Sequence, residues 1–218
     1  MKNIVILISG RGSNMVAIVD AVQQATIADA RIAAVVANKS NATGLDFARE
    51  RGIATAIVDH KAYPSREEFD AKLSAVIDTY KPDLVVLAGF MRVLTPGFVK
   101  HYEGRLINIH PSLLPAFPGL HTHANALASG VKLHGATVHF VTAELDCGPI
   151  VIQAAVPVRD DDDEAALAAR VLAQEHRIYP QAIEWIVSGR ARLEGGRVLL
   201  EDAADCPDGW CAPPLDQK

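Results

Sequence analysis

The first part of the chain alternates short apolar runs with segments that carry apolar residues at helical spacing. Asn3–Ile8 consists almost wholly of Ile, Val and Leu, and Met15, Ile18, Val19 and Val22 follow it after a glycine-rich stretch. Short apolar runs bounded by turn-forming residues are typical of strands buried on both faces, as in parallel sheets. Residues spaced three and four apart predict a helix after the glycine-rich stretch.

This alternation continues to about residue 110. The expected strands are Arg31–Ala37, Thr55–Val58, Leu84–Ala88 and Arg105–Ile109, and the expected helices are Ala42–Arg51, Arg66–Tyr80 and Pro96–Tyr102. Five strands alternating with helices predict an α/β fold with a doubly wound, mostly parallel sheet and helices on both faces. Ligands bind outside the carboxyl ends of such strands, so we expect Ser9–Asn14, Gly89–Leu94 and Asn108–Pro118 to meet in one crevice.

The second part of the chain has a different texture. Ala136–Thr142 and Pro149–Val156 are strand-like and are joined by turn-forming residues, which predicts an antiparallel edge to the sheet. Acidic residues precede a long helix over about Glu164–Val187, and Leu193–Leu200 around two glycines predicts a hairpin. We expect one catalytic domain over residues 1–189, followed by a C-terminal hairpin and a loosely held tail over residues 190–218.

Composition favours a globular chain without a membrane or nucleic-acid partner. Half of the 218 residues are hydrophobic and 22% are charged, which is enough apolar material for a well-buried core. No run approaches the roughly 18 apolar residues of a membrane span, and the first residues lack a signal peptide's layout. The net charge of -5 opposes general binding to nucleic acid, and three cysteines make no disulfide framework. We expect a cytoplasmic protein.

The loop Ser9–Asn14 joins the first strand to the first helix. Small residues and backbone amides before a helix can hold a phosphate, but a tight turn capped by Ser13 or Asn14 fits the local sequence equally well. The loop is not a Walker A motif, and Met15 stands where the third glycine of G-x-G-x-x-G would stand. An anion site remains open, whereas a nucleoside triphosphate or NAD site loses most of its support.

Asn108 and His110 end a predicted strand and, because they are two residues apart, face the same side. An Asn amide can donate to a developing oxyanion, and a His can act as acid, base or electrostatic stabiliser near neutral pH. Prolines at 111, 115 and 118 stiffen the loop that follows. From the residues alone, a buried polar pair bonded to loop backbone is the commoner arrangement.

Asp146 lies in the turn between the two late strands, two residues before Gly148. A carboxylate beside an imidazole orients the ring and favours its charged form. An Asp close to Gly more commonly caps its own backbone turn. The sequence leaves both roles open for Asp146.

Other side chains suggest metal or covalent chemistry more weakly. His121 and His123 share a side if their segment is extended, and His134 and His139 follow, but no acidic or thiol ligand lies beside the pair. Ser112 lacks the G-x-S-x-G context of a nucleophile. We expect neither a metal nor an acyl-enzyme.

Taken together, five motifs resemble the folate-dependent formyltransferase family. The Asn-x-His segment and the later Asp are shared across that family, whereas the phosphate loop and the Pro-Gly-Leu-His-Thr-His continuation resemble its glycinamide ribonucleotide branch. The resemblance spans Lys2 to about Gly189, and we expect none of the extra domains that some family members carry. The motifs are Ile8-Ser9-Gly10-x-Gly12-Ser13-Asn14, Leu87–Arg92, Asn108–Pro115, Gly119–His123 and Glu144-x-Asp146-x-Gly148-Pro149.

The resemblance implies residues for each ligand. Asn108 and His110 would act at the formyl group, with Asp146 behind the histidine. The ribonucleotide would be held by Gly12, Ser13 and Asn14 at its phosphate and touched by Glu175 at its ribose. The cosubstrate 10-formyltetrahydrofolate would be lined by Arg66, Met91, Arg92, Val93, Leu94, Asn108, Val141, Thr142, Ala143, Glu144 and Asp146, with Leu87, Phe90 and Leu106 as apolar walls.

The resemblance also implies an activity, the direct transfer of the formyl group from 10-formyltetrahydrofolate to the amine of glycinamide ribonucleotide in de novo purine biosynthesis. No metal and no covalent enzyme intermediate are required. The expected partners are these two small molecules, and the chain would be a monomer or a homodimer. Two alternatives stay open: hydrolysis of 10-formyltetrahydrofolate, with water in place of the amine, and a non-catalytic folate- or nucleotide-binding module.

Overall fold

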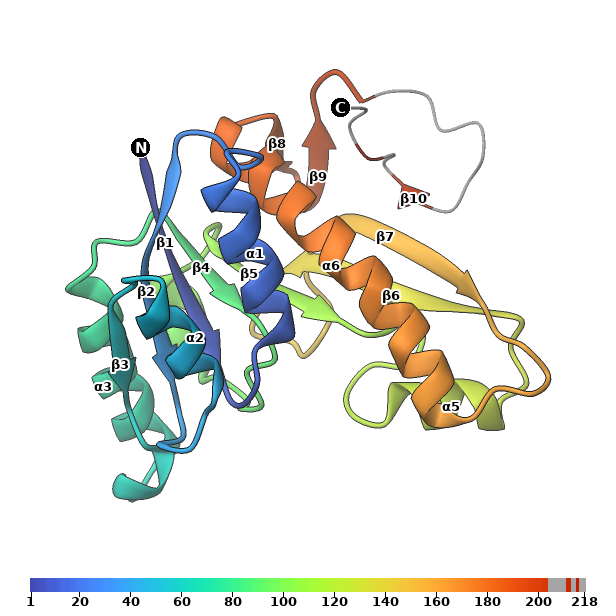
Figure 1. Ribbon diagram of the computed structural model, residues 1–218, viewed down its shortest axis with the longest axis horizontal. Coiled ribbons are helices and arrows are strands. Elements are labelled where there is room, and N and C mark those ends of the chain that lie inside the picture. The colour runs from blue at the N-terminus through green and yellow to red at the C-terminus, as the bar shows by residue number, and fades with distance from the viewer. Residues whose placement is uncertain (204–210, 213–214, 216–218) are drawn as a thin grey trace. The chain divides into compact units, whose positions relative to one another are not determined.

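The structure is a computed structural model that describes residues 1–203, 211–212 and 215. The chain forms two compact units, Met1–Asn108 and Ile109–Lys218. In Figure 1 the first unit runs from blue to green, and the second from green to red.

Five strands of the first unit pair in parallel in the order β3-β2-β1-β4-β5. Their central apolar residues, such as Val5, Ile6 and Leu7 in β1, are fully buried, as expected for a sheet covered on both faces. The strand β5 continues two residues beyond the unit's boundary. The strands are β1 (Lys2–Ile8), β2 (Ala30–Ala37), β3 (Thr55–Ile57), β4 (Leu84–Leu87) and β5 (Leu106–His110).

Helices connect these strands and cover both faces of the sheet. The path β1 to β3 moves in one direction and the path β3 to β5 in the other, so right-handed connections put the two helix pairs on opposite faces. Accordingly, α1 (Ser13–Gln23) contacts α2 (Gly44–Glu50), while α3 (Arg66–Asp78) contacts α4 (Pro96–His101). Figure 1 shows α1 and α2 in front of the strands. A short 3-10 helix, η1 (His60–Ala62), precedes α3.

Side-chain caps explain where α3 and α4 begin. The Ser65 hydroxyl accepts the Glu68 N–H at 3.2 Å, and the Thr95 hydroxyl accepts the Phe98 N–H at 3.3 Å. Each bond satisfies one of the amides that the first turn of a helix leaves without an intrahelical partner. The cap at Thr95 also fixes the end of the loop that follows β4.

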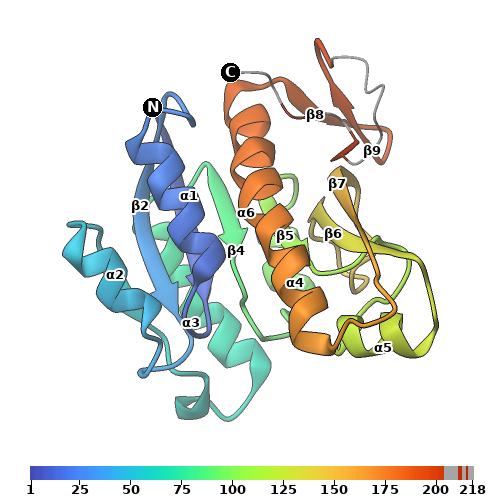
Figure 2. The ribbon, with the colours of Figure 1, turned by 45° about the vertical axis from the view of Figure 1, so that its right-hand side comes forward.

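The second unit is built on an antiparallel pair and one long helix, as Figure 2 shows. β6 (Leu133–Phe140) pairs with β7 (Ile150–Pro157), and α6 (Glu164–Ser188) packs on both strands. The Asp163 carboxylate caps α6 by accepting the Ala166 N–H at 2.7 Å. The remaining elements are α5 (Thr122–Ala128), which contacts α6, the hairpin β8 (Ala191–Glu194) and β9 (Arg197–Leu200), and β10 (Cys211–Ala212).

The predicted fold class is confirmed, with parallel and antiparallel pairings where the sequence pattern placed them. Two local alternatives that the sequence left open are not found in the structure. The helix after Gly12 begins without a side-chain cap from Ser13 or Asn14, because Gly12 itself occupies the cap position at φ 68°. His121 and His123 do not share an extended segment, because His121 has φ 59° and His123 lies in α5.

The C-terminal hairpin is confirmed, and its strands β8 and β9 begin and end within two residues of the predicted range. Beyond it, Cys211 and Ala212 pair with Ala154 and Gln153 of β7, so these two residues are tied to the sheet. Residues 204–210, 213–214 and 216–218 lie outside the described residues. The prediction of one domain over residues 1–189 stays a prediction.

Gly44 is the point at which α2 touches the loop after β1. Its N–H donates to the Gly10 carbonyl at 3.1 Å. A Cβ at Gly44 would lie 2.7 Å from Ile8 Cδ1 and 2.8 Å from the Arg11 carbonyl oxygen. The backbone of the loop therefore needs a glycine at this position.

We expect Gly44→Ala to lower the free energy of unfolding by about 1–3 kcal/mol, because the added methyl group must displace backbone. Urea unfolding of the purified variant measures this change. The control is Gly97→Ala in α4, whose Cβ would find its nearest neighbour at 4.0 Å and which should unfold at the parent's midpoint or slightly above it. Equal midpoints for Gly44→Ala and the parent would contradict the expectation.

Candidate active site

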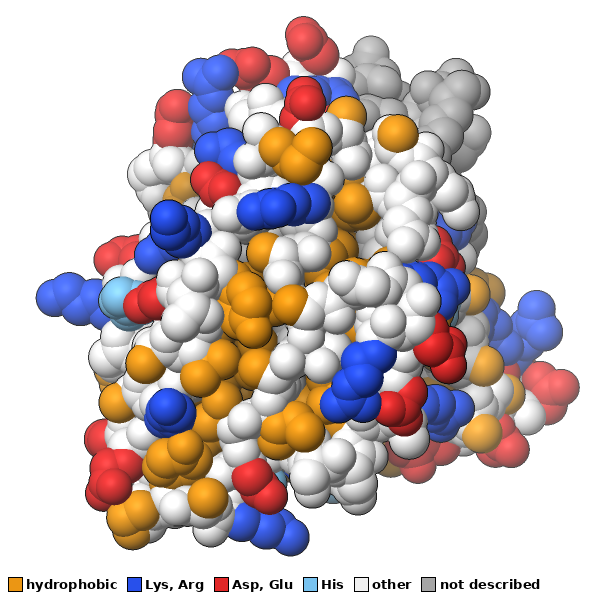
Figure 3. Space-filling view, turned by 60° about the vertical axis from the view of Figure 1, so that its left-hand side comes forward, with side chains coloured by type: hydrophobic (Ala, Val, Ile, Leu, Met, Phe, Trp, Pro, Cys, Tyr) orange, Lys and Arg blue, Asp and Glu red, His pale blue; other side chains and the backbone are white. Residues whose placement is uncertain are grey.

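The glycine loop of the first unit borders a pocket of about 240 Å³. Two cations and no carboxylate line this pocket, so it favours an anion. Basic and acidic side chains are interspersed over the face in Figure 3. An anion is therefore attracted by the local charges of the pocket more than by the face as a whole. The lining residues are Ser9, Gly10, Arg11, Gly12, Ser13, Asn14, Lys39, Ala88, Gly89 and Met91.

Ser9 is a buried junction between three segments of the first unit. Its hydroxyl donates to Asn38 Oδ1 at 2.6 Å and accepts the Met91 N–H at 2.8 Å. Asn38 is fully buried, and its carbonyl lies 2.8 Å from His60 Nδ1. A proton on that nitrogen completes the bond. The ends of β1, β2 and β4 are thereby held together by side-chain hydrogen bonds.

The loop after β4 carries four residues predicted to bind folate, Met91–Leu94. The buried Asp70 carboxylate of α3 accepts the Thr95 N–H at 2.6 Å and fixes the loop's far end. Met91 and Val93 are 63% and 57% exposed, so large apolar surfaces of this loop face solvent. The Arg92 guanidinium lies 5.9 Å from the Phe69 ring centroid, and its buried Nε has no hydrogen-bond partner among the described residues.

His110 and Asp146 meet in the second unit, as the sequence interpretation required. His110 Nδ1 lies 3.5 Å from Asp146 Oδ2, and both side chains are less than a tenth exposed. The other ring nitrogen, Nε2, lies 3.0 Å from the Phe117 carbonyl oxygen. Both ring nitrogens of His110 therefore face oxygen atoms, which fixes the orientation of the ring.

Asp146 is held by more than the histidine. Its Oδ2 accepts the Gly119 N–H at 2.9 Å, and its backbone adopts a left-handed φ of 53°. Gly148 is needed two residues later, because a Cβ there would run into the Phe140 carbonyl. The turn therefore presents the carboxylate inward instead of capping its own backbone.

A second histidine borders the same carboxylate. His139 Nε2 lies 3.9 Å from Asp146 Oδ1, while its Nδ1 lies 3.0 Å from the Phe140 carbonyl. Burial lowers the pKa of His139, and this effect outweighs the opposite effects of the Phe140 carbonyl and the Asp146 carboxylate. Since a carbonyl can only accept, the bond to Phe140 places a proton on His139 Nδ1, the nitrogen that does not face Asp146.

The loop that supplies the Phe117 carbonyl is fastened to β6 and β7. Buried Thr137 donates to the Ser112 carbonyl at 2.6 Å and accepts the Leu114 N–H at 3.0 Å. Gln153 Nε2 donates to the Leu114 carbonyl at 2.9 Å and to the Thr137 hydroxyl at 3.0 Å. Hydrogen bonds from β6 and β7 thus hold the loop after β5, in addition to the stiffness predicted from its prolines.

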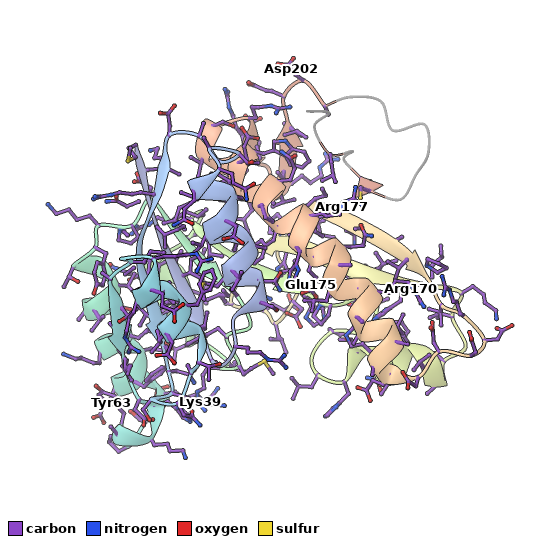
Figure 4. The ribbon with its side chains drawn as sticks, viewed as in Figure 1. Lys39, Tyr63, Arg170, Glu175, Arg177 and Asp202 are labelled. Atoms are coloured by element: carbon purple, nitrogen blue, oxygen red, sulfur yellow. The ribbon has the colours of Figure 1, made fainter. Side chains whose placement is uncertain are left out.

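The other predicted residues are spread over both units. Asn108 is the last residue of the first unit and lies two residues before His110 on β5. Arg66 is exposed in the first turn of α3, and Val141–Glu144 form the largely exposed loop after β6. Glu175 is buried in the middle of α6, labelled in Figure 4. Its contact with a ribose stays a prediction.

Sequence interpretation missed several residues that shape the site. Lys39 lines the pocket beside Ser9–Asn14 and follows the end of β2; it is labelled at the lower left in Figure 4. The rule that ligands bind at carboxyl ends of parallel strands could have pointed to it. The same rule applies to Asn38, which directly follows β2. Thr137 and Gln153 carry no such signal, because their importance lies in partners far away in the sequence. Among the described residues, no group of three or more His, Cys, Asp or Glu side chains is placed to hold a metal ion.

Comparison with known proteins defines the class. The chain belongs to the formyl transferase family, whose model, described as "Formyl transferase", matches residues 2–183. It is therefore an enzyme of formyl transfer. No helix in the described part of the chain is long and apolar enough to cross a membrane.

Three individual proteins show which members of the family this chain resembles in sequence and structure. The chain is 52% identical to phosphoribosylglycinamide formyltransferase of Escherichia coli, over 96% of this chain and 99% of that protein. It is 43% identical to the human trifunctional purine biosynthetic protein adenosine-3, over 89% of this chain and 19% of that protein. The crystal structure of glycinamide ribonucleotide transformylase 1 from Symbiobacterium toebii superimposes with a TM-score of 0.90 at 48% identity, covering 93% of this chain and 95% of that one.

His134 lies near the site and is 1% exposed. Its Nε2 is 3.2 Å from His123 Nδ1, and the two rings pack edge to face. Burial lowers the pKa of His134 from 6.5 to about 4, and the neighbouring His123 and His110 act in the same direction. Because the unfolded chain binds this proton at a higher pH than the folded one, stability is full above pH 6.5 and is lost as pH falls toward 4.

We expect the parent to lose about 2 kcal/mol more unfolding free energy than His134→Gln between pH 7 and pH 5, since each pH unit below 6.5 contributes about 1.4 kcal/mol. Urea unfolding at the two pH values gives the difference. The control is His101→Gln, a variant of an exposed histidine in α4. If parent and His134→Gln lose equal stability, the buried histidine is not the titrating group.

Proposed function

We propose that this enzyme transfers the formyl group of 10-formyltetrahydrofolate to the amine of glycinamide ribonucleotide, a step of de novo purine biosynthesis. The observation that carries the proposal is the buried His110–Asp146 pair, 3.5 Å apart, at the exit of the strand that also bears Asn108. Two relatives whose names state glycinamide ribonucleotide transformylation match 96% and 93% of the chain. The proposal includes a cytoplasmic location and a monomer or homodimer.

The chemistry requires stabilisation of one negative charge and movement of one proton. The amine nitrogen attacks the formyl carbon, and the carbonyl oxygen becomes an oxyanion. Asn108 donates a hydrogen bond to it, and protonated His110 adds positive charge. The bond from the formyl carbon to the folate nitrogen then breaks, and the proton lost by the amine ends on that nitrogen. Asp146 holds the histidine and relays this proton through water.

The phosphate-loop pocket supports ribonucleotide binding. Backbone amides of Gly12, Ser13 and Asn14 precede and open α1, where the helix N-terminus favours an anion. Arg11 and Lys39 add positive charge to the same pocket. We assign the phosphate of glycinamide ribonucleotide to this pocket and its ribose to Glu175.

The loop after β4 supports folate binding. Its exposed apolar side chains suit the flat pterin and benzoyl rings, and the unsatisfied Nε of Arg92 suits a carboxylate of the glutamate tail. Arg66 supplies a second cation on the adjoining helix. We assign Arg66, Met91–Leu94, Asn108 and Val141–Asp146 to this cosubstrate, with no metal.

The first test is the absorbance change of formyl transfer with purified protein and Asn108→Ala. The parent should consume 10-formyltetrahydrofolate only when glycinamide ribonucleotide is present. Loss of one oxyanion donor should lower kcat by about 10²–10³ in Asn108→Ala, while Asn41→Ala, an exposed control, should match the parent. Consumption of 10-formyltetrahydrofolate without ribonucleotide would favour hydrolysis. Tight binding of both ligands without turnover would favour a binding module. A near-normal kcat in folded Asn108→Ala would show that Asn108 is not a catalytic residue.

The second test concerns Asp146→Asn. This change removes the charge that faces His110 but keeps an oxygen for the Gly119 N–H. We therefore expect kcat to fall by about 10²-fold or more, the lower end of the range for general acid–base catalysis. The dissociation constant of glycinamide ribonucleotide, measured by calorimetry, should stay within about twofold of the parent's. The matched control is Asp161→Asn, which removes an exposed carboxylate before α6. Parent-like kcat in Asp146→Asn would reject its role.

A further inference from the structure

The hydroxyl of Ser9 makes two hydrogen bonds of opposite kind. It must accept from the Met91 N–H at 2.8 Å, because an amide can only donate. Its own proton is therefore directed to Asn38 Oδ1 at 2.6 Å. Ser9 is 6% exposed, so water does not readily replace either bond. Alanine at this position would leave the Met91 amide without its acceptor.

This hydroxyl lies where two loops meet. Ser9 begins the phosphate loop, three residues before Gly12, and Met91 begins the loop assigned to folate. Both residues line the same pocket of about 240 Å³. A ligand in that pocket therefore contacts the start of each loop, and the Ser9–Met91 bond joins them.

One side of the junction is fixed. Asn38 is fully buried, its N–H lies 3.4 Å from the Ile8 carbonyl, and its own carbonyl faces His60 Nδ1 at 2.8 Å. The far end of the folate loop is fixed as well, through the Asp70–Thr95 bond. The near end of the folate loop is held to the phosphate loop by the bond from the Met91 N–H to the Ser9 hydroxyl. Ordering of one loop therefore constrains the other at this point.

We propose that Ser9 is a positioning residue that couples the two substrates, so that ribonucleotide phosphate in the glycine loop tightens the binding of folate at Met91–Leu94. The inference rests on the proposed function and deepens it. A loop ordered by the first ligand need not be ordered again by the second, which gives positive coupling. The coupling is reciprocal, because thermodynamic linkage requires the same factor in both orders of addition.

The experiment measures the dissociation constant of glycinamide ribonucleotide by calorimetry, alone and with saturating tetrahydrofolate, which carries no formyl group to transfer. The ratio of the two constants is the coupling factor. We expect a factor of at least about 5 in the parent, the lower end of typical allosteric coupling. In Ser9→Ala the factor should fall below about 2, since the Met91 amide no longer follows the phosphate loop. Ser9→Thr keeps the hydroxyl and should retain the coupling.

Two serine controls separate coupling from general damage. Ser13→Ala should weaken ribonucleotide binding yet keep the parent's coupling factor, because Ser13 is assigned to the phosphate and not to Met91. Ser40→Ala replaces an exposed serine next to Lys39 and should match the parent in every constant. Thermal unfolding of each variant establishes that the proteins compared are folded.

The outcomes are decisive in both directions. A parent factor below about 5, or a factor of about 2 or more in Ser9→Ala, overturns the coupling role, even if both affinities fall together. Failure of Ser9→Ala to fold leaves the decision to Ser9→Thr, whose coupling must match the parent's. The proposed function stands or falls separately, because the parent's formyl-transfer assay does not depend on the coupling factor.

Discussion

The parallel register of the first unit is the constraint on which its binding loops depend. Leu7 of β1 pairs with Leu87 of β4, which pairs with Asn108 of β5, and Ile8 pairs with Ala37 of β2. The residues that follow these strands consequently emerge at one edge. A slip of one residue would turn each side chain to the opposite face and separate Ser9 from Asn38. Positions of the loops thus follow from backbone pairing before any ligand contributes.

Hydrophobic pattern was sufficient for most of this architecture. Buried strands such as β1 and β4 consist of Ile, Val and Leu, and their ends were predicted within one or two residues because a polar or glycine residue interrupts the run. Long α6 shows helical spacing over its whole length and an acidic start. In contrast, α5 has seven residues, of which only Thr122 and Ala126 are buried, so its apolar stripe is too short to show in the sequence. The family resemblance predicted that Asp146 lies beside His110, and the two side chains are 3.5 Å apart.

The rest of the site could not be predicted, because it consists of pairings between residues distant in sequence. Thr137 and Gln153 support the loop of Phe117 through bonds that span 16 to 39 residues. Nothing in their local composition distinguishes them from ordinary strand residues. The start of α1 was also hard to predict. Gly12 occupies the N-cap position in a left-handed conformation, and no side chain caps the helix as a Ser or Asn often does. Which residues pair by hydrogen bonds over such distances in the sequence is determined by the tertiary structure.

The Asp146 carboxylate lies between two histidine rings, those of His110 and His139, whose surroundings differ. His110 has an oxygen atom near each ring nitrogen, 3.0 Å and 3.5 Å away. His139 has one nitrogen engaged by a carbonyl, and burial lowers its pKa. Asp146 and the Phe117 carbonyl thus flank the two nitrogens of the His110 ring, whereas the Phe140 carbonyl fixes the orientation of His139.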